Sequence, residues 1–169
     1  VQFQRVVEGE TQDAPANQQK AQFHLGKSLY HLGFYQSALA VFDEIVERGQ
    51  SHLYFNATLL WLAQLASQLP EPADIVRRVG RYPAESLNQF NNAESRNLYN
   101  QLLYLMGRSK YRDGNYDEAI QLFGQVQRDS RYYVQAKFFS GISHVNARRS
   151  QPAVDAFREV LHAVEEGVE

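Results

Sequence analysis

The residues that could do chemistry in this sequence are few, and its five histidines come first. Histidine is the commonest metal ligand and changes its charge near neutral pH. His24 and His31 are seven residues apart, so on a helix they share a face at a separation of about 10 Å, too far for one metal ion. The sequence has no HExxH pair and no cysteine. We therefore expect neither a metal site nor a bound cofactor.

Catalytic nucleophiles and phosphate-binding loops have no recognisable context in the sequence. No GxSxG, no GxGxxG and no glycine-rich phosphate loop occurs, and the glycines are scattered along the chain. Serine, histidine and aspartate are present, but no local pattern pairs a nucleophile with a base. The sequence therefore predicts a protein that is not an enzyme and has no catalytic residue.

Aromatic residues interleaved with cations are the most informative chemical feature. The chain has ten tyrosines, ten phenylalanines and one tryptophan. Phe23, Lys27, Tyr30 and His31 follow at steps of four, three and one, which places them on one face of a helix. Aromatic rings and arginines are the usual anchors of binding surfaces. From the residues alone, two interpretations of this face stay open: its side chains form a binding surface, or its apolar members pack between neighbouring helices.

One sequence pattern recurs along the chain, and its copies would position aromatic faces of this kind. The stretch "YHLGFYQSALAVF" (30–42) recurs as "YRDGNYDEAIQLF" (111–123), 81 residues later. A further step of 34 residues reaches Gly141, Ala153 and Phe157, but places Arg148 where Gly114 stands. In each copy, apolar residues three and four apart predict two helices separated by a turn. The repeated unit is therefore predicted to be a helical hairpin.

Small residues at fixed positions indicate how the two helices of a hairpin meet. Gly107 and Ala119 are predicted to lie where the helices cross, with Phe123 filling the space beside them. The first helix is expected to end at Gly114, a favourable residue after a helix C-terminus. The second is expected to open at Asn115, with Glu118 three residues on completing a capping box.

The 34-residue step and the pattern Leu/Met-Gly, Gly-x-Tyr, Ala, Phe resemble the tetratricopeptide repeat family. In the stretch 51–86 the resemblance is weak, because Leu60 and Pro72 stand where small residues are expected. The resemblance implies an all-α, right-handed superhelical solenoid of antiparallel hairpins, with about four repeats, one of them degenerate. We expect a single domain, 1–169, which divides into a remnant helix (1–9), a repeat (19–50), a degenerate repeat (51–86), an irregular insert (87–99) and two further repeats (100–133 and 134–167).

In the family that the sequence resembles, the first helices line a concave surface that contacts the ligand. The resemblance therefore implies a non-catalytic scaffold that binds a peptide or helical segment of a partner protein in an aromatic-lined groove. The family's clamp for C-terminal carboxylates does not carry over, because Phe23 and Tyr104 replace its cations and Lys27 and Trp61 replace its asparagines. The predicted partner-binding residues are Phe23, Lys27, Tyr30, His31, Trp61, Tyr104, Arg108, Tyr111, Arg112, Phe138, Ile142 and Asn146.

Composition narrows the class of partner and suggests a location. The formal net charge is -2, which gives no reason to expect nucleic acid. The chain has no run of eighteen apolar residues, so no membrane insertion is expected. Its composition, rich in Gln, Asn and Tyr and poor in Lys, resembles tetratricopeptide proteins of bacterial cell envelopes. That resemblance implies envelope assembly and a periplasmic or envelope location, with the cytoplasm as the alternative.

Two other functions are compatible with the same sequence. The chain could be a regulatory or targeting domain of a larger multidomain protein. It could also be an oligomerisation module, because an apolar stripe on the last predicted helix has no following helix to cover it. Head-to-tail contact with the N-terminal stripe Phe3, Val6 and Val7 would then form a homo-oligomer. The C-terminal stripe consists of Val154, Phe157, Val160, Leu161 and Val164.

Overall fold

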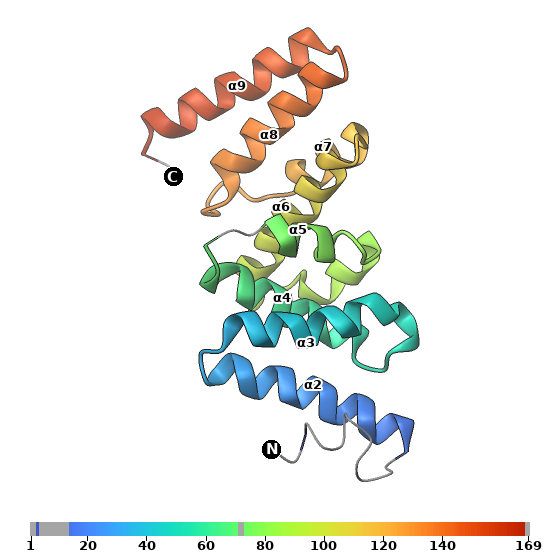
Figure 1. Cartoon of the computed structure of the whole chain (residues 1–169). Helices are drawn as coiled ribbons and strands as arrows, with labels where there is room; N and C mark the ends of the chain where they lie inside the picture. Colours follow the sequence, from blue (N-terminus) through green and yellow to red (C-terminus); the bar gives the residue numbers. More distant parts are fainter. Residues whose placement is uncertain (1–2, 4–13, 71–72, 168–169) are drawn as a thin grey trace. The chain divides into compact units, whose positions relative to one another are not determined.

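The computed structural model describes residues 3, 14–70 and 73–167, and every regular element in these ranges is helical (Figure 1). The predicted all-α fold is therefore confirmed, while the superhelical hand stays a prediction. The predicted helix at 1–9 lies outside the described residues, apart from Phe3. The α-helices are α2 (Pro15–His31), α3 (Tyr35–Arg48), α4 (Phe55–Gln68), α5 (Ala73–Val79), α6 (Arg96–Arg112), α7 (Tyr116–Gly124), α8 (Tyr133–Asn146) and α9 (Ser150–Glu165); the 3-10 helices are η1 (Gly49–Ser51) and η2 (Ala84–Phe90).

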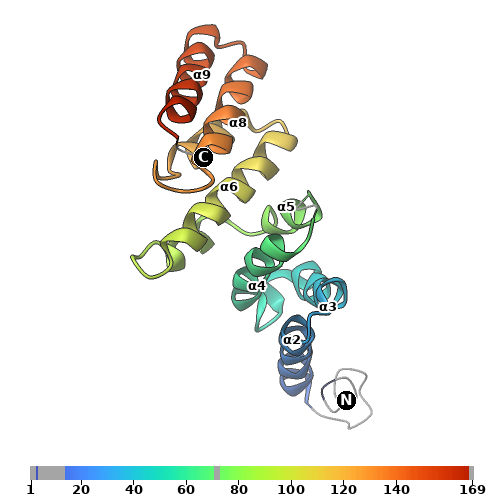
Figure 2. The same cartoon turned by 90° about the vertical axis from the view of Figure 1, so that its left-hand side faces the viewer.

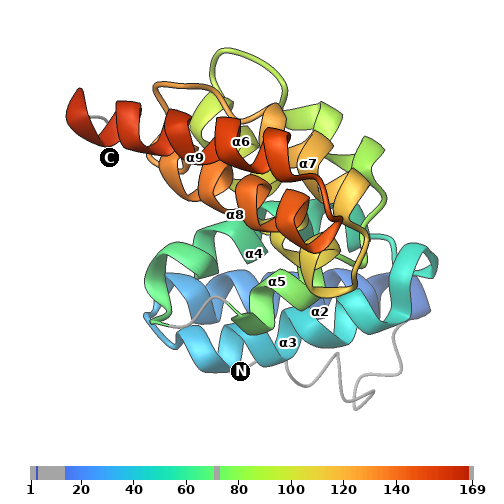
Figure 3. The same cartoon turned by 90° about the horizontal axis from the view of Figure 1, so that it is seen from above.

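The helices group into two compact units, residues 1–81 and 82–169. The first unit contains α2 to α5, and the second contains η2 and α6 to α9. Within the first unit α2 packs against α3, and α3 against α4 (Figure 3). Within the second unit the same order recurs, with α6 against α7, α7 against α8 and α8 against α9 (Figure 2). Each unit thus repeats the hairpin that the sequence predicted.

A glycine and a phenylalanine form the closest contact in three of the hairpins. A Cβ atom built on the glycine would lie 2.5–2.6 Å from a ring carbon of the phenylalanine, closer than real Cβ atoms approach. The ring therefore rests directly on the backbone of the first helix, and only glycine leaves room for it. This confirms the predicted crossing point and shows that the ring itself occupies it. The pairs are Gly26–Phe42, Gly107–Phe123 and Gly141–Phe157.

The turns between the paired helices need a left-handed residue. Gly33 and Gly114 have φ values of 83° and 81°, which glycine adopts without strain. Arg148 occupies the same place in the last hairpin with φ 61°, the only positive φ outside glycine among the described residues. The last hairpin, α8 and α9, therefore has the same left-handed turn residue conformation without a glycine.

The predicted capping box at the start of α7 is not formed. Asn115 is the N-cap residue, but its side chain makes no capping hydrogen bond. Glu118 instead pairs with Lys110 of the preceding helix, with a distance of 2.9 Å between Oε2 and Nζ. The carboxylate thus holds the two helices of the hairpin together, which a pattern of residues within one helix could not indicate.

The hairpin of α4 and α5 begins three residues later than the 34-residue step predicts. Tyr54 and Tyr132 each immediately precede a helix, 78 residues apart. Their backbone amides donate equivalent hydrogen bonds, the Tyr54 N–H to His52 Nδ1 and the Tyr132 N–H to Ser130 Oγ. In this register Ala63, which is fully buried, matches Gly141. A small residue is therefore present at this position after all, and the predicted substitution by Leu60 was a misalignment.

His52 anchors the connection between α3 and α4 on the first helix of the unit. Its side chain is 2% exposed, and its Nε2 donates to Gln22 Oε1 at 2.9 Å. Its Nδ1 accepts from the Tyr54 N–H at 3.0 Å, which requires this nitrogen to be unprotonated. Gln19 supports the same segment, because its Oε1 accepts from the Leu53 N–H. The three-residue shift is thus accommodated by a specific polar network.

Acid is expected to weaken the first unit through His52. Burial first, and the charge of Arg48 second, lower the pKa of His52 to about 4. A histidine in the unfolded chain titrates near 6.5, so between these values the unfolded state binds a proton that the folded state does not. The contribution is complete above pH 6.5 and is lost as the pH falls toward 4, with a slope of up to roughly 1.4 kcal/mol per pH unit. Chemical denaturation from pH 7 to 4 measures it, and His52→Gln should have a flatter slope.

Candidate binding site

A cluster of rings and one cation joins α2, α3 and α4 in the first unit; we call it cluster 1. Phe23 stacks on Tyr54 with 4.7 Å between ring centroids, and Trp61 stacks on Phe42 at 6.2 Å. Tyr30 contacts the Trp61 ring edge-to-face at 5.3 Å. The Nζ atom of Lys27 lies 5.6 Å from both the Phe23 and the Trp61 rings, within range of a cation–π interaction. Cluster 1 comprises Phe23, Lys27, Tyr30, Phe42, Tyr54 and Trp61.

The same arrangement is built again in the second unit by α6, α7 and α8, as cluster 2. Tyr104 stacks on Tyr132 at 5.4 Å, and Phe123 stacks on Phe139 at 6.1 Å. The guanidinium carbon of Arg108 lies 4.4 Å from the Phe139 ring centroid, and its Nη1 donates to the Tyr104 hydroxyl at 3.0 Å. A cation on aromatic rings thus recurs at the same position in both units. Cluster 2 comprises Tyr104, Arg108, Tyr111, Phe123, Tyr132 and Phe139.

The predicted partner-binding residues divide into three groups by exposure. Phe23 and Tyr104 are buried, with 6% and 8% exposed, and support the cations rather than offer a surface. Lys27, Tyr30, Trp61, Arg108, Tyr111 and Ile142 are half-buried, and His31, Arg112, Phe138 and Asn146 are exposed. Cluster 1 brings together four of the predicted residues and cluster 2 three, whereas His31, Arg112, Phe138, Ile142 and Asn146 belong to neither cluster.

Asn146, His31 and Arg112 lie at the edges of these clusters. His31 contacts the Trp61 ring edge-to-face at 5.5 Å. The Asn146 side chain donates to the Tyr111 hydroxyl at 3.4 Å, which ties α8 to α6. Arg112 is exposed and has no ion-pair partner among the described carboxylates. His31 and Asn146 thus contact aromatic members of clusters 1 and 2, respectively.

Charge is segregated between the first and the second helices of the hairpins. No aspartate or glutamate occurs in α2, α4, α6 or α8. Their second helices, in contrast, contain Asp43, Glu44 and Glu47 in α3 and further carboxylates in α5, α7 and α9. The cations of the first helices are Lys20, Lys27, Arg96, Arg108, Lys110, Arg112 and Lys137.

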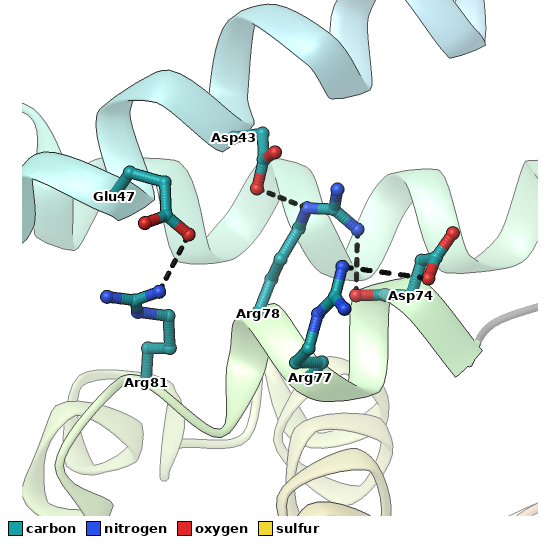
Figure 4. Close-up of polar contacts among 6 residues, drawn as sticks. All are labelled: Asp43, Glu47, Asp74, Arg77, Arg78 and Arg81. Atoms are coloured by element: carbon teal, nitrogen blue, oxygen red, sulfur yellow. Dashed lines mark hydrogen bonds and ion pairs between the residues drawn. The ribbon is translucent and has the colours of Figure 1, made fainter.

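The carboxylates of α3 are largely neutralised within the first unit. Arg78 of α5 donates through Nε to Asp43, and Arg81 pairs with Glu47 at 2.7 Å (Figure 4). Figure 4 also shows Arg77 pointing back to Asp74 on its own helix. Lys27 and Arg108 have no such partner: no described carboxylate lies within ion-pair distance of either.

The charge of Lys27 is also felt by its neighbour His24. The pKa of His24 is lowered, first by burial and then by Lys27 and Lys20. Burial is likewise the main reason that the pKa of Tyr132 in cluster 2 is raised. Both shifts favour the neutral forms of His24 and Tyr132.

Other kinds of site find no support in the described part of the chain. The residues described include no group of three or more metal-ligating side chains. None of the described helices is long and apolar enough to cross a membrane. The best-formed hollows are shallow and polar; the larger, of about 410 Å³, is lined by Gln18, Gln22 and carboxylates of α3 that already have partners.

These features define a helical-repeat protein, built from hairpins with a glycine–phenylalanine crossing. A family model described as the tetratricopeptide repeat matches residues 104–167. This match makes residues 104–167 similar to the tetratricopeptide repeat family, whose members are generally protein–protein interaction modules and typically non-catalytic. No curated protein and no solved structure matches the chain.

Five aromatic residues of the clusters are absent from the predicted set: Phe42 and Phe123, which rest on the glycines of their hairpins, and Tyr54, Tyr132 and Phe139. Tyr54, Tyr132 and Phe139 each stack on a residue of the preceding hairpin. A 34-residue step from Tyr104 selects Phe138 instead of Phe139. The available signal was the spacing of seven residues that separates Tyr54 from Trp61 and Tyr132 from Phe139.

Proposed function

We propose that the chain binds a segment of a partner protein against the first helices of its hairpins, with clusters 1 and 2 as the contact points. The observation that carries this proposal is the equivalent placement of Lys27 and Arg108 over aromatic rings without a described carboxylate partner. The role is non-catalytic. A concave groove formed by the first helices is the surface that this proposal requires.

The chemistry of the clusters favours an acidic segment that also carries apolar side chains. A carboxylate placed between Lys27 or Arg108 and the exposed cations nearby would gain charge-assisted hydrogen bonds. The edges of half-buried Tyr30, Trp61 and Tyr111 would cover an adjacent apolar side chain. Nucleic acid is disfavoured, because carboxylates cover the second helices and the formal net charge is -2.

Matched peptides test this proposal with the intact chain. Three soluble peptides of equal length and equal leucine and tyrosine content carry glutamate, glutamine or lysine at the remaining positions. Titration calorimetry is expected to show binding of the glutamate peptide, weakened by salt. The glutamine peptide should bind at least about tenfold more weakly, which corresponds to about 1.4 kcal/mol. Equal binding of the two peptides would contradict a role for the cations.

Variants of the chain assign the binding to the clusters. Lys27→Gln combined with Arg108→Gln is expected to reduce the affinity for the glutamate peptide by about tenfold or more. Lys20→Gln is the matched control, since Lys20 is an exposed lysine of the same helix without a ring contact among the described residues. Thermal unfolding by circular dichroism would verify that all variants are folded. A double variant that binds as tightly as the control would overturn the proposal.

Envelope assembly in bacteria, self-association and a regulatory or targeting role stay predictions of the sequence. The observation that bears on self-association is the exposure of the C-terminal stripe, where Leu161 is 63% exposed and Val164 is 45% exposed. The C-terminal stripe contributes no residue to clusters 1 and 2.

A further inference from the structure

The last hairpin, α8 and α9, contains part of a third aromatic cluster. Phe138 and Phe157 lie with ring centroids 6.0 Å apart and an interplanar angle of 56°. The corresponding pairs are Phe23–Phe42 at 6.2 Å and 59°, and Tyr104–Phe123 at 6.3 Å and 48°. The Phe157 ring also rests on a glycine of the first helix, as the other two do. The ring pair and its contact with the glycine thus have the same geometry in the last hairpin as in clusters 1 and 2.

The third cluster lacks the rings that cover the other two. In the first two, the following helix supplies a tyrosine at its start and a second ring seven residues later. Under this cover Phe23 and Tyr104 are 6% and 8% exposed, whereas Phe138 is 45% exposed. Phe42 and Phe123 are fully buried, whereas Phe157 is only half-buried. No helix of the described residues covers this surface.

Helix α9 shows the same difference from α3. Counted from their phenylalanines, Val154 and Leu161 of α9 match Leu39 and Val46 of α3. Leu39 and Val46 are 7% and 1% exposed beneath α4, but Val154 and Leu161 are 43% and 63% exposed. The uncovered area therefore extends over both helices of the last hairpin. It corresponds to the surface of the first hairpin against which α4 packs in the first unit.

Substitutions within this surface make it apolar. Where clusters 1 and 2 have a lysine or an arginine, the third has Ile142, and where they have a tyrosine, it has Val145, which is 55% exposed. The helices that cover the first two clusters are themselves poor in charge: α4 has no charged residue, and α8 has only Lys137. A helix that binds to the third cluster therefore needs no charged side chain on the face that contacts it.

We propose that this terminal surface, formed by Phe138, Ile142, Val145, Phe157 and Leu161, binds an amphipathic helix of a partner protein. The occupant is defined by the two covers within the chain: a tyrosine at the start of the helix, an aromatic residue seven positions later, and an uncharged inner face. The tyrosine stacks on Phe138, as Tyr54 stacks on Phe23 and Tyr132 on Tyr104. The later ring stacks on Phe157. This surface adjoins cluster 2, since Phe138 contacts Phe139 edge-to-face at 5.7 Å, but it includes neither Lys27 nor Arg108.

The chain itself provides the probe. A peptide of residues 129–147, "DSRYYVQAKFFSGISHVNA", contains the cover of cluster 2, and a Phe139→Ala, Tyr132→Ala version of it is the control. Fluorescence anisotropy of labelled peptides, titrated with the intact chain, is expected to show at least tenfold weaker binding of the control peptide. Hydrogen exchange should show protection of α8 and α9 by the first peptide. Equal binding of the two peptides, or protection elsewhere, would overturn the proposal.

Charged substitutions on the exposed residues then test the surface without disturbing the core. Val145→Asp and Leu161→Asp change side chains that are more than half exposed, so both variants should fold. Each is expected to weaken peptide binding at least tenfold, while Gln121→Asp on α7 should not. Light scattering of the chain without peptide tests whether a second copy of the chain occupies the surface instead. A dimer of the chain that Leu161→Asp dissociates would replace the proposed partner helix by a second copy.

Discussion

Gly107→Leu is expected to lower the free energy of unfolding of residues 82–169 by about 3 kcal/mol, the upper end of the usual cost of overpacking a core. A Cβ atom at this position would lie 2.6 Å from Cε1 and 2.8 Å from Cδ1 of Phe123. The Phe123 ring is fully buried and stacks on Phe139, so it cannot move aside without disturbing cluster 2. Urea denaturation followed by circular dichroism measures the loss.

A pair of identical substitutions separates the close contact from the change of residue type. Gly107→Ala and Gly124→Ala both replace a helical glycine. By propensity alone alanine is favoured by up to roughly 1 kcal/mol in a helix interior, where Gly107 lies, and by less at Gly124, the last residue of α7. No atom lies within 4 Å of a Cβ built on Gly124, so its variant should be as stable as the wild type or more stable. Gly107→Ala should be less stable despite its larger gain in propensity. If the two variants were equally stable, the Phe123 ring would not rest on this backbone.

Phe123→Ala is expected to cost about 3–5 kcal/mol, as is usual for removal of a buried ring. Phe157→Ala should cost less than half as much, although the two residues occupy the same position in successive hairpins. The reason is the cover: Phe123 is fully buried beneath Phe139, whereas Phe157 is half-buried and has no ring above it among the described residues. Denaturation of the two variants under one set of conditions gives the comparison.

The outcome of this comparison also bears on the terminal surface. Equal losses would mean that the Phe157 ring is as fully covered in solution as the Phe123 ring, for example by a second copy of the chain. Repeating the measurement with the peptide of residues 129–147 present should enlarge the loss for Phe157→Ala alone, because only the wild-type ring gains the cover.

The helices and their crossing points could be predicted because the sequence repeats them at fixed offsets. Gly107, Ala119 and Phe123 recur at the offsets of 81 and 34 residues, and each fills a place where only its size fits. The two cations were also predictable, since Lys27 and Arg108 share a face with aromatic residues one turn away. The sequence could therefore predict the positions of side chains that make their contacts within one hairpin.

Contacts between successive hairpins could not be predicted in the same way. They depend on the spacing between the phenylalanine of one hairpin and the tyrosine that precedes the next, which is twelve residues from Phe42 to Tyr54 but nine from Phe123 to Tyr132. A strict repeat step passes over this difference, so it assigns Leu60 to the place that Ala63 occupies and does not select Phe139, which matches Trp61. The partner of Glu118 escaped prediction for a related reason, since Lys110 lies on the other helix of the hairpin.

Trp61 is the single tryptophan of the chain, and its place in cluster 1 gives residues 1–81 an optical label. Its indole is half-buried between Phe42 and Lys27, so its emission should change when α4 leaves α3. Residues 82–169 have tyrosines but no indole, so ellipticity reports on both units and tryptophan emission on one. One denaturation series with both readouts thus distinguishes a chain that unfolds in a single step, with coincident transitions, from one whose units unfold separately.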